Sequence, residues 1–301
     1  MTHPLAVHFV PDSGHAAELV RMGAVAFHYD PLFVTAVSEL FVQHGLEGHG
    51  SPLRPEKVSF FGNLYFAATE QSPYRDRADL LKLRQAALVR CEADWDLAPY
   101  QAYRTAIADM PADIRASLKL DPDQSFHWRF LYDELSIVAN GEHRFRLLDT
   151  CKLPIAFYGG FADPSSRATI ADRAWLLRES LPYGRPLAEA YRSTSITLDV
   201  VNAPFINGFS PKLLECYAAG GFLLTTRKRD IATAFGGLAD AIGYSSADEL
   251  TAKIDYYLTH DSERRSVTRD MQEIIRHNYT ASALFARTLP VAVESLRARR
   301  T

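Results

Sequence analysis

Residues 207–225, NGFSPKLLECYAAGGFLLT, hold a helix start, a helix and a buried strand in immediate succession. Ser210 suits an N-cap, and Pro211 suits the first helical position because it has no amide to leave unpaired. Two glycines follow the helix, and the apolar run 222–226 predicts a strand. The apolar run 196–201 precedes the segment. This strand, helix, strand order is typical of a parallel α/β sheet.

Other short apolar runs that end at turn residues lie at 6–10, 24–28, 58–61, 155–158 and, more weakly, 241–244. Each run is too short for a helix, and helical patterns separate the runs. The sequence therefore predicts a doubly wound, parallel, Rossmann-like sheet.

Helical patterns dominate two further parts of the chain, residues 246–299 and 74–151. Ser246 and Glu249 form a capping box at the start of one predicted helix, and two more helices are expected over 261–277 and 281–299. The stretch 74–151 is almost free of strand signals and is broken only near three prolines, so it is interpreted as a helical insertion.

The 301 residues allow one large domain or two modest ones. We expect a short, incomplete N-terminal α/β lobe over 1–56, which is either a remnant or a minimal lobe. A main domain over 57–301 would contain the insertion 74–151.

Composition limits the classes of partner. The chain is 47% hydrophobic and 23% charged, as in an ordinary globular protein, and its net charge of −3 provides no positive field for nucleic acid. Cys91, Cys151 and Cys216 are widely spaced, which fits reduced thiols and no metal site. No secretory signal or membrane-spanning run occurs. We therefore expect a cytoplasmic protein with neither a nucleic-acid partner nor a membrane span.

Lys212 and Glu215 share one outward-facing arc of the helix that starts at Pro211. A helix N-terminus at the carboxyl end of a parallel strand offers amides to an anion such as a diphosphate, and a carboxylate one turn later could bind a ribose hydroxyl pair. Taken alone, this pattern more often marks a surface helix with solvated charges.

A family resemblance favours the binding interpretation. Residues 191–278 resemble the donor-binding domain of group 1 glycosyltransferases of the GT-B fold, especially the branch related to spore-maturation proteins. The resemblance rests on Tyr191, the strand that ends at Asp199, Glu215, AAGGFLLT at 218–225 and YSSADEL at 244–250. More weakly, 58–63 and 155–160 resemble the first strand and the middle strand of that domain. The middle strand ends at the glycine turn Gly159 and Gly160.

The resemblance implies roles for particular residues. Glu215 would bind the ribose, and the backbone around Leu181 and Tyr183 would meet the base. The diphosphate would be held by Lys212 and the loop before it, which is formed by Asn207, Gly208, Phe209 and Ser210. Asn207 stands where the wider superfamily often has a second glutamate.

The expected activity is that of a glycosyltransferase of the hexosyltransferase type. It would move a sugar from a nucleotide diphosphate donor, with a UDP-sugar favoured, to an unknown glycan, protein or small-molecule acceptor, without a cofactor or metal. The alternative is a catalytically silent module that binds a nucleotide or a partner. The residues identify no catalytic group. Neither a Rossmann dinucleotide motif nor a P-loop occurs, which argues against a dehydrogenase and a P-loop enzyme.

Several weaker candidates remain. Arg75 and Arg77 follow the first glycine turn and could begin a helix there as phosphate ligands. Arg144 and Arg146, in the predicted helix 125–150, could reach a phosphate, but salt bridges to neighbouring acids explain them as well. Asp121 and Asp123 match a metal-binding Asp-x-Asp motif, although a turn before a helix is favoured.

Overall fold

The computed structural model describes residues 8–21, 27–29, 41–43, 56–64, 74–160, 170, 173 and 175–298. Its main sheet has six strands in the order β5-β4-β3-β6-β7-β8, and neighbouring strands pair in parallel. The strands are β3 (Glu56–Phe61), β4 (Ile155–Tyr158), β5 (Leu176–Arg178), β6 (Thr194–Asp199), β7 (Leu223–Thr226) and β8 (Gly243–Tyr244). Counted from β3, this is the 3-2-1-4-5-6 order of a Rossmann fold. The predicted fold class is confirmed.

The central strands are buried on both faces, as expected where helices cover a parallel sheet. Phe60 on β3 stacks on Phe157 of the neighbouring β4, and Ile196, Leu198 and Leu224 are fully buried in the same core. Strand β5 was not predicted. It lies at the edge of the sheet with partly exposed side chains, so it lacks the apolar run by which the other strands were found.

The described part of the C-terminal half contains seven helices, and the predicted ones among them, which start at 211, 247, 261 and 281, begin where expected. The seven helices are α10 (Arg185–Ser193), α11 (Pro211–Ala218), α12 (Arg229–Phe235), α13 (Leu238–Ile242), α14 (Ala247–Thr259), α15 (Asp261–Asn278) and α16 (Ala281–Ala298). The Ser210 Oγ accepts the Lys212 amide hydrogen at 3.3 Å and caps α11. At α14 the Ser246 Oγ accepts from the Glu249 amide at 3.1 Å. The Glu249 carboxylate in turn accepts from the amide of Ser245 at 2.8 Å. This is the return hydrogen bond of a capping box, made here to the residue before the N-cap and not to the N-cap itself.

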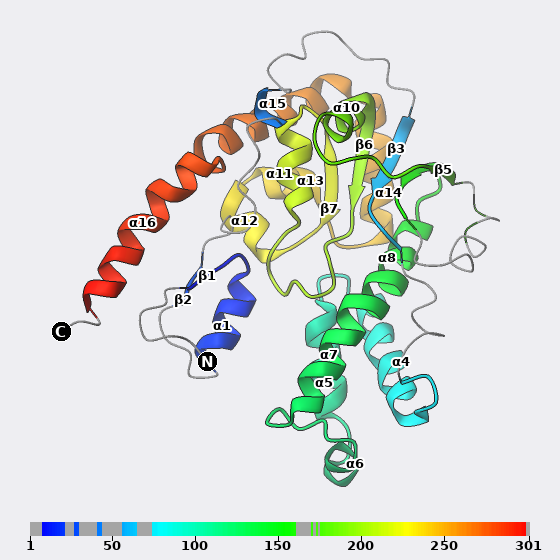
Figure 1. Cartoon of the computed structure of the whole chain (residues 1–301). Coiled ribbons are helices and arrows are strands. Elements are labelled where there is room, and N and C mark those ends of the chain that lie inside the picture. Colours follow the sequence, from blue (N-terminus) through cyan, green and yellow to red (C-terminus); the bar gives the residue numbers. More distant parts are fainter. Residues whose placement is uncertain are drawn as a thin grey trace.

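The insertion is helical, as predicted. It contains α4 (Ala78–Ala93), α5 (Pro99–Ala108), α6 (Ala112–Ser117), α7 (Ser125–Asp133), the π-helix η1 (Glu134–Ala139) and α8 (Asn140–Asp149). A buried ion pair joins Arg84 to Glu134, with nitrogen to oxygen distances of 2.6 and 2.7 Å, and the Tyr103 hydroxyl donates to the same carboxylate. Figure 1 shows these helices extending from the sheet on the side where β3 ends.

The N-terminal part forms β1 (His8–Val10), α1 (Ser13–Arg21) and β2 (Phe27–Tyr29), with β1 and β2 parallel. The predicted strands 6–10 and 24–28 are therefore present, although residues 6, 7 and 24–26 lie outside the described residues. The domain limits 1–56 and 57–301 stay predictions. No helix within the described ranges is long and apolar enough to cross a membrane.

Candidate functional site

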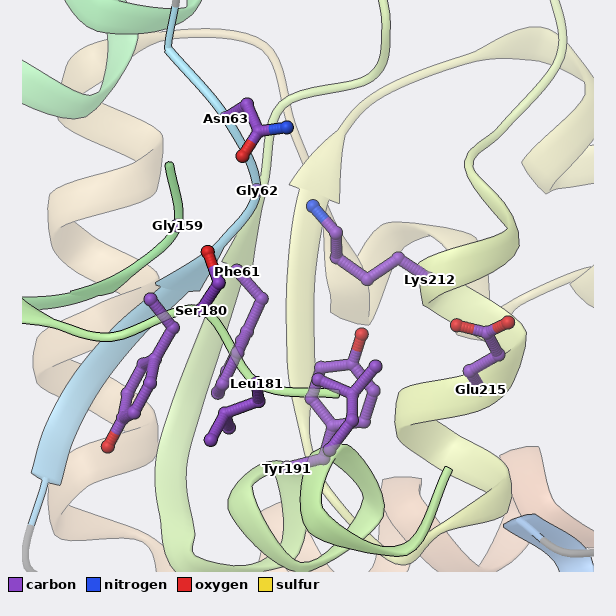
Figure 2. A pocket seen from close by; sticks show the side chains of 11 residues that line it. Phe61, Gly62, Asn63, Gly159, Ser180, Leu181, Tyr191, Lys212 and Glu215 are labelled. Carbon is purple, nitrogen blue, oxygen red and sulfur yellow. The ribbon is translucent and has the colours of Figure 1, made fainter. Parts of the chain in front are cut away.

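A cleft opens at the carboxyl ends of β3, β4 and β5, opposite helix α11 (Figure 2). It lies at the point where strand order reverses on either side of β3, which is where open α/β sheets bind ligands. Its lining residues are Phe61, Gly62, Asn63, Tyr158, Gly159, Ser180, Leu181, Leu187, Tyr191, Lys212 and Glu215.

Two turns in close contact form one end of the cleft. A Cβ on Gly159 would lie 1.8 Å from the carbonyl oxygen of Gly62, so only glycine allows these backbones to approach. The amide of Gly62 donates to the carbonyl oxygen of Tyr158 at 2.9 Å, and the amide of Gly160 donates to Asn63 Oδ1 at 2.9 Å. The turns after β3 and β4 therefore form one hydrogen-bonded unit. Sequence reasoning did not identify Asn63 as a member of the site.

Lys212 extends from the first turn of α11 toward the sheet (Figure 2). Its ammonium lies 3.1 Å from Asp199 Oδ1 and 4.7 Å from the centroid of the Phe60 ring, with 15% of the side chain exposed. The Asp199 carboxylate is buried at the end of β6, and its other oxygen accepts from the Thr225 hydroxyl at 3.0 Å. Burial lowers the pKa of Lys212, and the charge of Asp199 opposes this shift.

Asp199 was missed as a site residue. The available signal was a single acidic residue at the carboxyl end of an apolar strand, next to a loop that leads to a lysine. Its pairing with Lys212 depends on how α11 lies over the sheet.

Glu215 lies one turn after Lys212 at the mouth of the cleft. Its carboxylate accepts a hydrogen bond from the Tyr183 hydroxyl at 2.9 Å. Burial raises the pKa of Glu215, whereas the Tyr183 hydrogen bond and the Lys212 charge act in the opposite direction. Burial and the nearby carboxylate raise the pKa of Tyr183 to about 12. The structure thus brings together Lys212, Glu215, Gly159 and Tyr183, as the sequence predicted.

The predicted diphosphate loop has a different environment from the one expected. Asp12, which is fully buried, accepts hydrogen bonds from the amides of Ile206 at 2.7 Å, Asn207 at 3.1 Å and Gly208 at 2.9 Å. An internal carboxylate therefore occupies the anion-binding amides of this loop. The Asn207 side chain donates to the Ser13 hydroxyl at 3.0 Å.

The rest of that loop also points away from the cleft. Ser210 caps its own helix, and Phe209 is buried against Phe235. None of the four predicted residues 207–210 is among those that line the cleft. These residues act on the cleft indirectly, because they lead into α11 and set its position.

The remaining candidates lie elsewhere. Arg77 is exposed just before α4 and does not line the cleft. Asp121 pairs with Arg115 at 2.6 Å in the predicted turn. Among the described residues, no three His, Cys, Asp or Glu side chains are grouped as metal ligands would be.

Residues 148–289 match a family model described as glycosyl transferase-like. The chain therefore carries a glycosyltransferase-like domain over these residues. The match confirms the resemblance found in the sequence and the predicted enzyme class. The matched segment includes Gly159, Lys212 and Glu215, whereas Asn63 and most of the insertion precede it.

Among solved structures, this chain is similar to a DNA-modifying β-glucosyltransferase determined with and without its substrate uridine diphosphoglucose. The sequence identity is 10% and the TM-score is 0.43, over 92% of this chain and 62% of that chain. The chain therefore spans less than two thirds of that protein's length. A search of curated proteins finds no match.

Proposed function

We propose that this glycosyltransferase takes its sugar from a nucleoside diphosphate sugar, with a UDP-sugar favoured, and that the nucleotide binds in the cleft beside β3. The observation that carries the proposal is the convergence of Lys212 and Glu215, one helical turn apart, on a cleft whose other side is made of glycine turns. A cation and a carboxylate at this spacing match the diphosphate and the ribose diol of one ligand.

The diphosphate is placed beside the Lys212 ammonium. An ammonium group has three donors, and Asp199 accepts one of them at 3.1 Å. Asp199 also fixes the direction of the side chain, so the lysine is oriented before the ligand arrives. The turns at Gly62 and Gly159 carry no side chain that would keep a phosphate away from the backbone.

The nucleoside is placed along the rim of the cleft. Glu215 offers carboxylate oxygens to the ribose hydroxyls, and Tyr183 holds this carboxylate by a hydrogen bond of 2.9 Å. The base would lie along the backbone near Leu181, which lines the cleft. The acceptor would meet the sugar on the side of the N-terminal lobe and the insertion.

Binding of UDP and UMP, measured by calorimetry, tests this assignment. In Lys212→Ala we expect UDP to bind roughly ten- to hundredfold more weakly, because a hydrogen bond to an ionised group is worth about 1.5–3 kcal/mol. The loss for UMP should be smaller. Glu215→Gln should weaken UDP and UMP to similar extents, because its partner is the ribose.

Lys82→Ala, at an exposed position on α4, is the matched control and should bind as the wild type does. Equal affinity in all variants would place the nucleotide elsewhere. Incubation of the wild type with UDP-sugars and detection of released UDP separates an active enzyme from a silent module, since a silent module would bind without turnover.

A further inference from the structure

Arg144, on α8 of the insertion, reaches the carboxyl ends of two central strands. Its guanidinium donates to the carbonyl oxygen of Asn63 at 3.1 Å and to that of Val200 at 3.3 Å, and it also donates to the side chain of Asn202. Asn63 follows β3, and Val200 follows β6. These strands pair directly in the sheet, so one side chain joins the two loops at the point where strand order reverses.

The position suits an arginine in particular. Arg144 is 6% exposed, and its guanidinium carbon lies 5.6 Å from the centroid of the Phe60 ring, which the Lys212 ammonium also contacts. A planar guanidinium holds several donors in a fixed arrangement and can bridge separate carbonyl groups, whereas an ammonium on a flexible stem acts as a point charge.

A second residue of α8 holds the same loop. Asn140, one turn before Arg144, accepts a hydrogen bond at Oδ1 from the amide of Ala203 at 2.8 Å. Residues four apart lie on one face of a helix, so Asn140 and Arg144 contact the loop 200–203 together. The insertion is thereby attached to the loop that leads toward α11.

The contact continues from Arg144 to the cleft. Asn63, whose carbonyl accepts from Arg144, uses its side chain to accept from the amide of Gly160. Figure 2 shows Asn63 at the same end of the cleft as the Lys212 ammonium. We propose that Arg144 is a positioning residue of the donor site, through which the insertion sets the relative position of the glycine turns and of the loop before α11. This inference rests on the proposed function.

Two readouts test the inference in the full-length chain. The first is hydrogen exchange at the amides of Gly62, Gly160 and Ala203, which requires no ligand. The second is the affinity for UDP. In Arg144→Met we expect faster exchange at these amides and roughly tenfold weaker UDP binding. Arg144→Lys keeps the charge but not the bridge, so it should restore little of either property.

Arg146→Met is the matched control, because Arg146 lies on the same helix and pairs with Glu92 and Glu142. It should leave both readouts unchanged.

Unchanged exchange and affinity in Arg144→Met would overturn the inference. Weaker UDP binding without faster exchange would also overturn it, because that result indicates a direct effect of the arginine charge on the ligand. If Arg144→Met does not fold, hydrogen exchange and UDP affinity are measured in Arg144→Lys, and the same outcomes support or overturn the inference. A wild type that fails to bind UDP, combined with faster exchange in Arg144→Met, would refute the proposed function and leave the structural contact standing.

Discussion

Lys212 and Glu215 carry opposite charges one helical turn apart, and burial acts against both charges. It lowers the pKa of Lys212 and raises that of Glu215. Lys212 has a buried partner in Asp199, but the strongest contact of Glu215 is the neutral hydroxyl of Tyr183. Glu215 is therefore held in a setting that disfavours its charge, as is common where a residue serves binding at the expense of stability.

This setting predicts how stability depends on pH. A carboxyl group whose pKa is higher in the folded state stabilises the fold only while it is protonated, and that contribution is lost as pH rises through the folded pKa. Glu215→Gln removes the ionisation. We expect the variant to be more stable than the wild type at pH 7, with a difference that declines as pH falls through the raised folded pKa and is gone below the usual carboxyl value of 4.5.

Urea unfolding across this pH range measures the difference. Glu189→Gln, at an exposed position on α10, is the control for removal of a surface carboxylate. A variant less stable than the wild type at pH 7 would contradict the prediction.

Helix α11 is the element that carries both proposed ligand-binding side chains. Its first turn depends on Ser210, whose hydroxyl accepts from the amide of Lys212 itself. The cap therefore fixes the backbone from which the lysine side chain extends. Helix α14 has an equivalent N-cap in Ser246, but no residue of α14 lines the cleft.

The two caps give a matched pair of variants. Ser210→Ala and Ser246→Ala should each lower the free energy of unfolding by about 1 kcal/mol, because each leaves a helix amide without its acceptor. Only Ser210→Ala should also weaken UDP binding. Denaturation and calorimetry on the two variants measure these effects, and equal UDP affinities would show that the cap does not position Lys212.

At the scale of the whole molecule, Asp12 joins the N-terminal part to the main sheet domain. Its carboxylate accepts from three consecutive loop amides almost two hundred residues away, and it also accepts from the amide of His15 at the start of α1. The start of α1 packs closely against this loop, because a Cβ on Gly14 would lie 2.5 Å from the side chain of Ile206.

Asp12→Ala should therefore lower the free energy of unfolding by at least about 2 kcal/mol, since a buried amide without an acceptor costs about 1–3 kcal/mol. It should also make the α1 segment more susceptible to limited proteolysis. Asp113→Ala, at an exposed position on α6, is the control. If the two variants unfold alike, Asp12 does not hold the N-terminal part in place.

The sequence by itself determined those features that depend on neighbours along the chain. The caps at Ser210 and Ser246, the strand runs and the common arc of Lys212 and Glu215 all follow from local hydrogen bonding and helical periodicity. Strand and helix alternation, together with the rule that crossovers are right-handed, then predicts the parallel sheet and brings its carboxyl ends to one edge.

Only the tertiary structure decided which distant groups meet at that edge. The acceptor beside Lys212 is Asp199, the anion held by the loop 206–208 is Asp12, and the group that bridges β3 and β6 is Arg144. Each of these contacts joins a charge to a partner outside its own element, and a buried charge or amide takes whichever partner packing places within reach. Local patterns carry no information on that packing. The sequence therefore predicted the helix that carries the site but not the groups that hold it in position.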